Sequence, residues 1–360
     1  MRLRELRLKN LRPFERLELD LGSTWNVFVG ANGAGKTTVL EAAYLLSHGR
    51  SFRTGPRDAL IRRGSAGYSV FGVVESGDGG PSLGVGLSRG PGTLEARIAG
   101  STVPLADLLR RVAVACFEPG SHELISGPAE ERRSFLDWGV FHVEHDFLRV
   151  WRTFQRALKQ RNALLRSGGG GAALDPWDQE LARSGAELSA MRVRYIAALA
   201  PIVGALLLDL LPELGAARLA LDGGWADEAT ARAELAAARD DDTRRGFTTR
   251  GPHRADWSIA FEHAPRREHL SRGQEKLCAL GCILGQAQVY ADGHGEWPIV
   301  CIDDLASELD APHQEKVVRV LAGASTQILV TGTHEPDALR AVGIAAARFH
   351  VEPGRVTQLL

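Results

Sequence analysis

A glycine-rich stretch near the N-terminus restricts the possible folds of this 360-residue chain more than any other part of it. Residues 30–38 read Gly-Ala-Asn-Gly-Ala-Gly-Lys-Thr-Thr, which matches the pattern G-x-x-x-x-G-K-S/T. An apolar run, Trp25–Val29, precedes this stretch, and an apolar segment with helical periodicity follows it as far as Leu46. A buried strand, a glycine turn and a helix in this order are typical of phosphate-binding loops in α/β proteins.

The residue types of this loop suit a nucleoside triphosphate bound with magnesium. Glycines let backbone N–H groups turn toward phosphate oxygens without a Cβ clash, and the helix N-terminus adds partial positive charge. We expect Lys36 to neutralise the β- and γ-phosphates, and the Thr37 hydroxyl to ligate Mg²⁺. The sequence thus predicts an ATP–Mg²⁺ site formed by Gly30, Ala31, Asn32, Gly33, Ala34, Gly35, Lys36, Thr37 and Thr38.

A pair of aspartates is the candidate catalytic partner of the loop. Asp303 ends the run Ile299–Ile302, whose four apolar residues are typical of a central parallel strand, and Asp304 follows directly. We expect Asp303 to hold Mg²⁺, and Asp304 to act as the base that polarises the attacking water. The alternative is that either aspartate merely caps the helix that follows.

Lys36 and Asp303 lie too far apart in sequence for small GTPases or kinases. A third motif indicates which other class of phosphate-loop protein the chain resembles. Residues 270–276 read Leu-Ser-Arg-Gly-Gln-Glu-Lys, which resembles the L-S-G-G-Q/E signature of ABC ATPases with Arg272 at the first glycine. Ser271, Gly273 and Gln274 would open a helix and form a second anion site. The resemblance implies that this site binds the γ-phosphate held by another copy, in a twofold dimer. An ordinary N-capped helix is the alternative.

Other short segments resemble further elements of the same superfamily. Residues 307–310 read Ser-Glu-Leu-Asp, similar to the loop that crosses the dimer interface, which assigns Asp310 to the nucleotide site. His334 resembles the switch histidine that senses the γ-phosphate, although it could instead be a simple loop residue. No glutamine occupies the usual metal-loop position, where Glu118 stands instead. Related heads imply that Arg12 touches a nucleotide phosphate.

Periodicity along the chain predicts three segments. Residues 1–120 carry strand-like alternation, the phosphate loop and a Gly-rich antiparallel sheet over 66–100, and residues 121–245 are mainly helical, with a hairpin over 121–165 and 175–211 around a break at 167–171. Strand-like sequence returns in residues 246–360 with the signature and the aspartate pair. The expected fold is α/β: an ABC-type ATPase head with a mixed central sheet and an antiparallel β subdomain, into which a helical arm is inserted.

Charge and cysteine content exclude several classes of protein. With 43 Lys and Arg against 44 Asp and Glu, any nucleic-acid site must be a local basic patch. The four cysteines do not form a disulfide framework or a metal-ligand pattern, which favours reduced thiols. Residues 1–21 lack the apolar core of a signal peptide, and the run 196–214 contains Pro201, Asp209 and Pro212, which predicts that it does not span a bilayer. We expect a cytoplasmic protein without a membrane partner.

Three basic clusters are candidate contacts for DNA phosphates. One lies at helical spacing on a single face and comprises Arg152, Arg156 and Lys159. Another follows the phosphate-loop helix and comprises Arg50, Arg53 and Arg57, with Arg62 and Arg63 nearby. The third alternates along the N-terminal strand and comprises Arg4, Arg7 and Lys9. We expect all three to face one groove of a dimer, whereas the alternative is that each is a solvated face. No base-reading motif is evident, so binding should depend on salt and shape.

Longer blocks give the chain a more specific resemblance. The arginine pair within Arg-Arg-Ser-Phe-Leu-Asp-Trp (132–138) and the block Gly-Pro-His-Arg (251–254) resemble the RecF family of DNA-repair proteins, an SMC-like branch of the ABC ATPases. Further blocks of the same resemblance are 9–14, 49–53, 127–128, 159–162, 255–256 and 303–310. From the residues alone, Arg132 and Arg133 could pair with Asp137, and His253 or Arg254 could reach nucleotide, a dimer partner or only a turn.

The family resemblance implies a head of two sheets, a short helical arm and an ATP-closed homodimer on duplex DNA or on single-/double-strand junctions. It also implies weak, DNA-stimulated ATP hydrolysis, gap repair and replication restart with RecO and RecR, RecA loading and the SOS response. Two other functions share some of the motifs. A transporter's ATPase subunit would share the loop, signature and aspartates but be indifferent to DNA, and a nucleotide kinase would act as a monomer on a second substrate.

Overall fold

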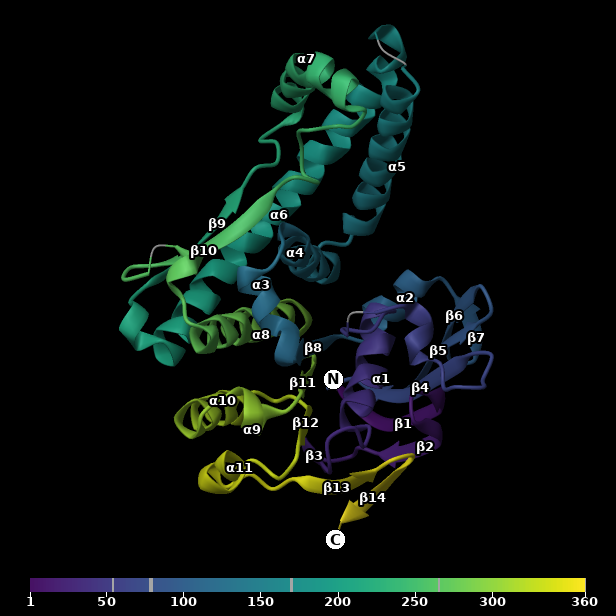
Figure 1. The fold of residues 1–360 in the computed structure, drawn as a ribbon, viewed down its shortest axis with the longest axis vertical. Coiled ribbons are helices and arrows are strands. Elements are labelled where there is room, and N and C mark those ends of the chain that lie inside the picture. The colour runs from purple at the N-terminus through teal and green to yellow at the C-terminus, as the bar shows by residue number, and fades with distance from the viewer. Residues whose placement is uncertain (54, 78–79, 169–170, 265, 360) are drawn as a thin grey trace. The chain divides into compact units, whose positions relative to one another are not determined.

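The computed structural model describes residues 1–360 apart from 54, 78–79, 169–170, 265 and 360 (Figure 1). The chain divides into two compact units, which are described separately: unit 1 contains Met1–Ser121 and Ala279–Leu360, and unit 2 contains His122–Cys278. Residues 246–278, which the sequence analysis assigned to the head, thus belong with the arm. The reason is long-range pairing that sequence periodicity does not report, since strand β10 (Asp256–Phe261) pairs with β9 (Ala217–Asp222).

The central sheet of unit 1 has six strands in the order β14-β13-β3-β12-β11-β8. Every neighbouring pair is parallel except the C-terminal hairpin of β13 and β14. All four residues of β11 are buried, as expected for a central parallel strand. The strands are β3 (Trp25–Val29), β8 (Val114–Phe117), β11 (Ile299–Ile302), β12 (Ile328–Gly332), β13 (Ala347–Glu352) and β14 (Arg355–Leu359).

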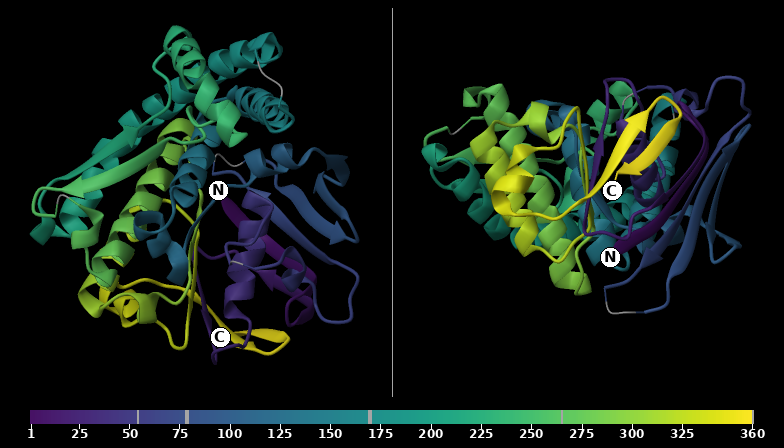
Figure 2. Two further views of the ribbon diagram at one scale, coloured as in Figure 1. Left: turned by 45° about the horizontal axis from the view of Figure 1, so that its top comes forward. Right: turned by 90° about the horizontal axis from the view of Figure 1, so that it is seen from below.

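The second sheet of unit 1 is antiparallel, in the order β2-β1-β4-β5-β6-β7. Apolar residues alternate along its strands and turn one face toward the core, where α1 (Lys36–His48) lies between the two sheets (Figures 1 and 2). The predicted mixed central sheet and antiparallel subdomain are confirmed. The strands are β1 (Arg2–Leu11), β2 (Phe14–Asp20), β4 (Tyr68–Glu75), β5 (Leu83–Gly90), β6 (Thr93–Ile98) and β7 (Ser101–Val103).

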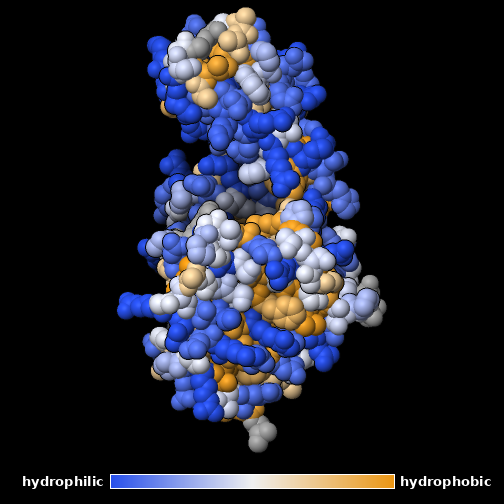
Figure 3. Space-filling model, turned by 90° about the vertical axis from the view of Figure 1, so that its right-hand side faces the viewer, coloured by the Kyte–Doolittle hydropathy of each residue, from blue (hydrophilic) through white to orange (hydrophobic). Residues whose placement is uncertain are grey.

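Buried Gln327 joins the two sheets of unit 1. Its side-chain oxygen accepts from the backbone N–H of Leu3 at 2.8 Å, and its side-chain nitrogen donates to the carbonyl oxygens of Leu3 and Leu21. The outer face of the antiparallel sheet is mostly hydrophilic, with hydrophobic residues gathered in its middle (Figure 3). Phe71 is a large exposed hydrophobic residue of β4, and the Arg7 guanidinium lies 5.5 Å from the centre of its ring.

Helices α2, α9, α10 and α11 complete unit 1, and α8 contains the boundary between the units in sequence. They are α2 (Leu105–Arg111), α8 (Arg272–His294), α9 (Leu305–Glu308), α10 (Ala311–Gly323) and α11 (Asp337–Val342). Unit 2 contains α3 (Glu123–Ser126), α4 (Ala129–Val143), α5 (Phe147–Arg166), α6 (Asp175–Leu210) and α7 (Glu228–Arg245). Short 3-10 turns are η1 (Arg57–Leu60), η2 (Pro119–His122), η3 (Gly171–Ala173), η4 (Pro212–Leu214) and η5 (Arg267–His269).

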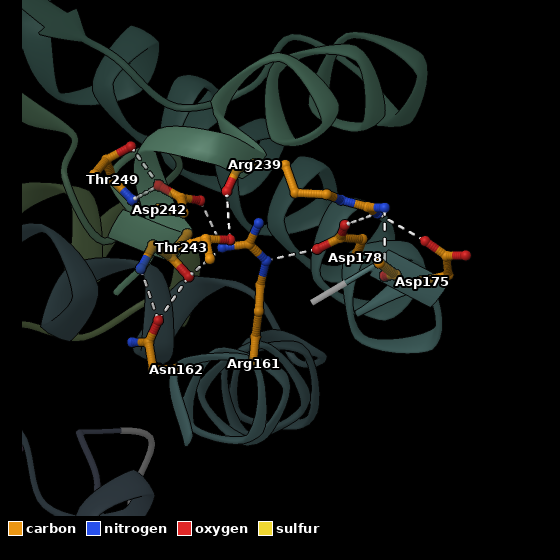
Figure 4. A network of polar contacts seen from close by, with 10 residues as sticks. Arg161, Asn162, Asp175, Asp178, Arg239, Asp242, Thr243 and Thr249 are labelled. Atoms are coloured by element: carbon orange, nitrogen blue, oxygen red, sulfur yellow. Dashed lines mark hydrogen bonds and ion pairs between the residues drawn. The ribbon is translucent and has the colours of Figure 1, made fainter. Parts of the chain in front are cut away.

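The predicted helical hairpin is formed by α5 and α6, which pack along each other. Part of its predicted break, residues 169–170, lies outside the described residues. Fully buried Arg161 holds the hairpin to α7: it bonds to Asp178 of α6 at 2.5 Å and to Asp242 of α7 at 2.6 Å (Figure 4). Arg239 of α7 bonds in turn to Asp178, so that charged groups from three helices are paired with one another.

Helix α6 agrees with the helix expected over 175–211: it contains Pro201 and Asp209 and ends before Pro212. Pro201 lies inside the helix, and within the described ranges α6 is the one helix long and apolar enough to cross a membrane. Leu199, Val203 and Leu207 are nevertheless buried within the protein, whereas Leu208 is 52% exposed. One packed side and one outer side are typical of a helix that packs within its own domain, and this packing maintains the helix across the proline.

Candidate nucleotide-binding site

A cavity of about 390 Å³ in unit 1 brings the phosphate loop and the aspartate pair together. The loop leaves β3 at Gly30 and enters α1 after Gly35, the order predicted from the sequence. Only glycine fits at both positions. A Cβ at Gly30 would lie 2.2 Å from the carbonyl oxygen of Val351, and Gly35 has φ +111° and would contact Phe14. Within the loop, Asn32, Gly33 and Thr38 also line the cavity.

Lys36 and Thr37 both line the cavity. The Lys36 ammonium donates to the carbonyl oxygens of Gly30 and Ala31, at 2.8 and 3.0 Å. The Thr37 hydroxyl donates to Oδ1 of Asp303 at 3.0 Å, although the two residues are far apart in sequence. Hydroxyl and carboxylate oxygens at this separation form a donor set that fits Mg²⁺, because this ion prefers hard oxygen ligands.

Asp303 is buried at the end of β11. Burial raises the pKa of its carboxyl group, and this effect is opposed by hydrogen bonds from Thr331 and Thr37 and by the charge of Arg53. The Thr331 hydroxyl donates to the same Asp303 oxygen, Oδ1, at 2.5 Å. Thr331 was not singled out in the sequence, and it reaches the site because its strand β12 pairs with β11.

Asp304 adopts a conformation that is rare for a non-glycine residue, with φ +56°. Its backbone N–H donates to the Thr331 hydroxyl oxygen at 2.9 Å. The side chain makes no capping hydrogen bond to α9, and its buried Oδ1 has no hydrogen-bond partner in the described part of the chain. The capping alternative therefore finds no support at Asp304, whose side chain is among those that line the cavity.

Two arginines also line the cavity. Arg12, expected here by resemblance, has φ +50° and forms a two-point ion pair with fully buried Glu41, with an Nη2–Oε1 distance of 2.6 Å. The Ser51 hydroxyl donates to Glu41 and accepts from the backbone N–H of Arg53. Arg53, which the sequence analysis grouped with DNA contacts, therefore lies at the nucleotide cavity. Sequence reasoning missed Glu41, although an acidic residue within the otherwise apolar segment of α1 could have marked it as a candidate.

The signature residues lie in unit 2, at the start of α8. Ser271 and Gln274 form a reciprocal cap: Gln274 N–H donates to the Ser271 hydroxyl oxygen at 3.3 Å, and Ser271 N–H donates to the Gln274 side chain at 3.0 Å. Ser271 is exposed and Gln274 is half-buried, and no described residue outside the local helix backbone lies within 4 Å of the place where a Cβ at Gly273 would be. The helix N-terminus is thus open to an external anion.

Other candidate nucleotide residues lie outside the cavity lining. Asp310 caps α10, accepting from the backbone N–H of His313 at 3.0 Å. His334 is exposed, and its ring nitrogen Nδ1 lies 3.1 Å from the Thr333 hydroxyl. The Glu118 carboxylate accepts from the backbone N–H of Gly120, while Pro119 lines the cavity.

The candidate DNA residues are distributed over both units. Arg152, Arg156 and Lys159 are all exposed on α5. Arg50 is exposed in unit 1, and the side chain of Arg57 lies outside the described part. In the N-terminal cluster, Arg4 pairs with Glu75 and Arg7 with Glu5, so this cluster is partly neutralised.

Residues of the arginine and histidine blocks make contacts within unit 2. Arg132 pairs with Asp256 at 2.7 Å and Asp137 pairs with Arg192 at 2.8 Å, so the expected pairing of Arg132 with Asp137 is wrong. The correct partners come from distant segments, which spacing along one helix does not reveal. His253 lies in a turn with Nε2 3.0 Å from the Thr248 carbonyl oxygen, and burial lowers its pKa to about 4.

Comparison with solved structures identifies the fold. The chain is similar to the structure of the recombination mediator protein RecF-ATP in the RecFOR pathway, with a TM-score of 0.89, 24% identity, and coverage of 99% of this chain and 97% of that one. It is also similar to an SMC head bound to the C-winged helix domain of ScpA, with a TM-score of 0.62, 16% identity, and coverage of 100% and 98%. The fold is therefore that of an SMC/ABC-type ATPase.

Sequence relatives identify the family. The profile of the RecF/RecN/SMC N terminal domain family matches residues 2–352. The DNA replication and repair protein RecF of Stenotrophomonas maltophilia (strain R551-3) is 46% identical over 363 residues, and that of Edwardsiella ictaluri (strain 93-146) is 36% identical over 358 residues, each match covering 99% of both chains. The chain belongs to the RecF family.

Proposed function

We propose that this protein is an ATP-dependent DNA-binding protein of recombinational gap repair and replication restart, which hydrolyses ATP slowly and uses the nucleotide as a dimerisation switch. The observation that carries this proposal is the single cavity lined by Lys36, Thr37 and the pair Asp303–Asp304. Membership of the RecF family supports the role in DNA repair, because relatives that match over the full length are named DNA replication and repair proteins.

The residues of the cavity would have separate roles in ATP hydrolysis. Lys36 and the backbone N–H groups of the loop would bind the phosphates, while Thr37 and Asp303 would hold Mg²⁺. When bound, Mg²⁺ neutralises charge on the phosphate oxygens. Asp304 would accept a proton from the attacking water as its oxygen bonds to the γ-phosphorus and the bond to the leaving ADP oxygen breaks. Arg12 and Arg53 would add positive charge beside the phosphates.

Dimerisation follows from the placement of the signature. Ser271 is exposed and Gln274 is half-buried at the N-terminus of α8, in a different unit from the phosphate loop. A γ-phosphate held by one copy would bind this open helix end on a second copy, so that each ATP is shared by two subunits. In this proposal Asp310 and His334, which lie outside the cavity lining, would contribute only in the closed dimer.

The test of this function is the mass of the particle in solution, measured with and without duplex DNA in ATP or a non-hydrolysable analogue. We expect a monomer without nucleotide, a dimer with it, and faster turnover with DNA. Ser271→Ala should bind ATP as a monomer yet fail to dimerise. A particle that stays monomeric with ATP, or one whose dimerisation is unaffected by Ser271→Ala, would refute the shared-site model.

DNA binding is expected to use the exposed basic stripe Arg152, Arg156 and Lys159 on α5. Replacing all three with alanine should lower the slope of log affinity against log salt by about 3 per protomer, because each phosphate contact contributes about 0.9. The matched control replaces Arg183, Arg194 and Arg232, which already pair with glutamates in the same unit. Equal slopes for the two triple variants would exclude the stripe.

Partners and setting are proposed from the family alone. We expect RecR and RecO to act with this protein at gap junctions, and the outcome to be RecA loading and support of the SOS response. We also expect the protein to act in the cytoplasm, in keeping with four cysteines that form no disulfide.

A further inference from the structure

Thr331 contacts both aspartates of the proposed nucleotide site. It lies on β12, the strand beside β11 in the central sheet, and it is fully buried. Its hydroxyl donates to Oδ1 of Asp303 at 2.5 Å and accepts from the backbone N–H of Asp304 at 2.9 Å. A hydroxyl has a single proton, so donation to Asp303 turns its lone pairs toward the Asp304 N–H, and the two bonds support each other.

The two bonds of Thr331 fix two different groups of the site, the Asp304 backbone and the Asp303 carboxylate. The left-handed conformation of Asp304 is unfavourable for a residue with a side chain, and such conformations persist only where surrounding contacts impose them. Asp303 Oδ1 also accepts from Thr37 at 3.0 Å, but Thr37 is a proposed Mg²⁺ ligand and would turn to the ion. Thr331 is therefore the hydroxyl partner that Asp303 would keep when the site is loaded.

We propose that Thr331 is a positioning residue for ATP hydrolysis: it orients the Asp303 carboxylate toward Mg²⁺ and maintains the Asp304 backbone in the conformation that directs its side chain into the cavity. This inference rests on the proposed function, and it deepens the account of the same site. If Thr331 is a positioning residue, its replacement should have its largest effects on ATP turnover and on the increase in ATP affinity that Mg²⁺ causes. Binding of ATP without Mg²⁺ should change little, because it depends on Lys36 and the loop.

The test compares Thr331→Val, which keeps the shape but loses the hydroxyl, with Thr331→Ser, which keeps the hydroxyl. The control is Thr326→Val in the same unit, because Thr326 is also buried and its hydroxyl donates to a backbone carbonyl, that of Pro298. Thr326→Val likewise removes a buried threonine hydroxyl, but one that bonds to a backbone carbonyl and to neither aspartate. Turnover, ATP affinity in EDTA and ATP affinity in Mg²⁺ are measured for each full-length variant, with thermal unfolding alongside.

We expect Thr331→Val to lower kcat about 100-fold, since small displacements of catalytic groups have effects of that size. It should also lose most of the affinity gained on adding Mg²⁺, while its affinity in EDTA stays within about threefold of the parent. Thr331→Ser should restore both quantities, and Thr326→Val should change neither. A Thr331→Val protein with parental kcat, a serine variant that restores nothing, or equal losses with and without Mg²⁺ would each overturn the proposal. A parent protein without ATP turnover would instead refute the proposed function.

Discussion

Asp304→Asn should reduce ATP turnover by at least about 100-fold while ATP-induced dimerisation persists. The amide has nearly the shape of the carboxylate but cannot accept the proton of the attacking water. Because nucleotide is bound by other residues, the variant should accumulate as a closed, ATP-loaded dimer on DNA. Phosphate release and particle mass, measured on the same sample, check both halves of this expectation.

The control for this variant is Asp337→Asn, which makes the same chemical change on an exposed aspartate in the first turn of α11. It should hydrolyse ATP at the parental rate. Rapid turnover by Asp304→Asn would remove Asp304 from the role of base, and another group would have to activate the water. Loss of ATP binding would show instead that Asp304 supports the architecture of the site.

Lys36→Ala should weaken ATP binding by about 100-fold or more, because it removes a buried charge that would contact the β- and γ-phosphates. Dimerisation and DNA-stimulated turnover should be lost with it at ordinary ATP concentrations. Titration of a fluorescent ATP analogue measures the affinity directly. Circular dichroism shows whether the variant is folded, since Lys36 also bonds to the loop carbonyls of Gly30 and Ala31.

Lys316→Ala provides the comparison for this loss of one lysine, because Lys316 lies on α10 and is not among the residues that line the cavity. Its ATP affinity should equal that of the parent. If Lys36→Ala bound ATP as tightly as Lys316→Ala, the phosphate loop would not be the nucleotide site, and the cavity would need a different ligand.

Local sequence was sufficient for the elements of this site. The strand Trp25–Val29 and the strand Ile299–Ile302 have the predicted bounds, because runs of apolar residues next to a glycine loop or an acid have few other stable conformations. The carboxyl ends of parallel strands meet at one edge of a sheet, so the meeting of Thr37 with Asp303 followed from the strand assignments.

Side-chain partners from distant segments were beyond such reasoning. Arg53 looked like one member of a basic surface cluster, but Ser51 and Glu41 anchor its loop beside the cavity. Arg132 pairs with Asp256, more than a hundred positions away, in place of its neighbour on α4. Which side chains pair depends on which segments pack together, and the periodicity of a single segment does not predict this packing.

By itself the sequence determined the family of the protein and the strand, glycine loop and helix of its phosphate loop, because glycine freedom and strand periodicity are properties of short segments. Tertiary structure alone decided that residues 246–278 pack with the arm, that Arg161 satisfies carboxylates from two other helices, and that Thr331 contacts both aspartates. The physical reason is that a buried polar group must find partners wherever the fold brings them, and those partners can lie anywhere along the chain.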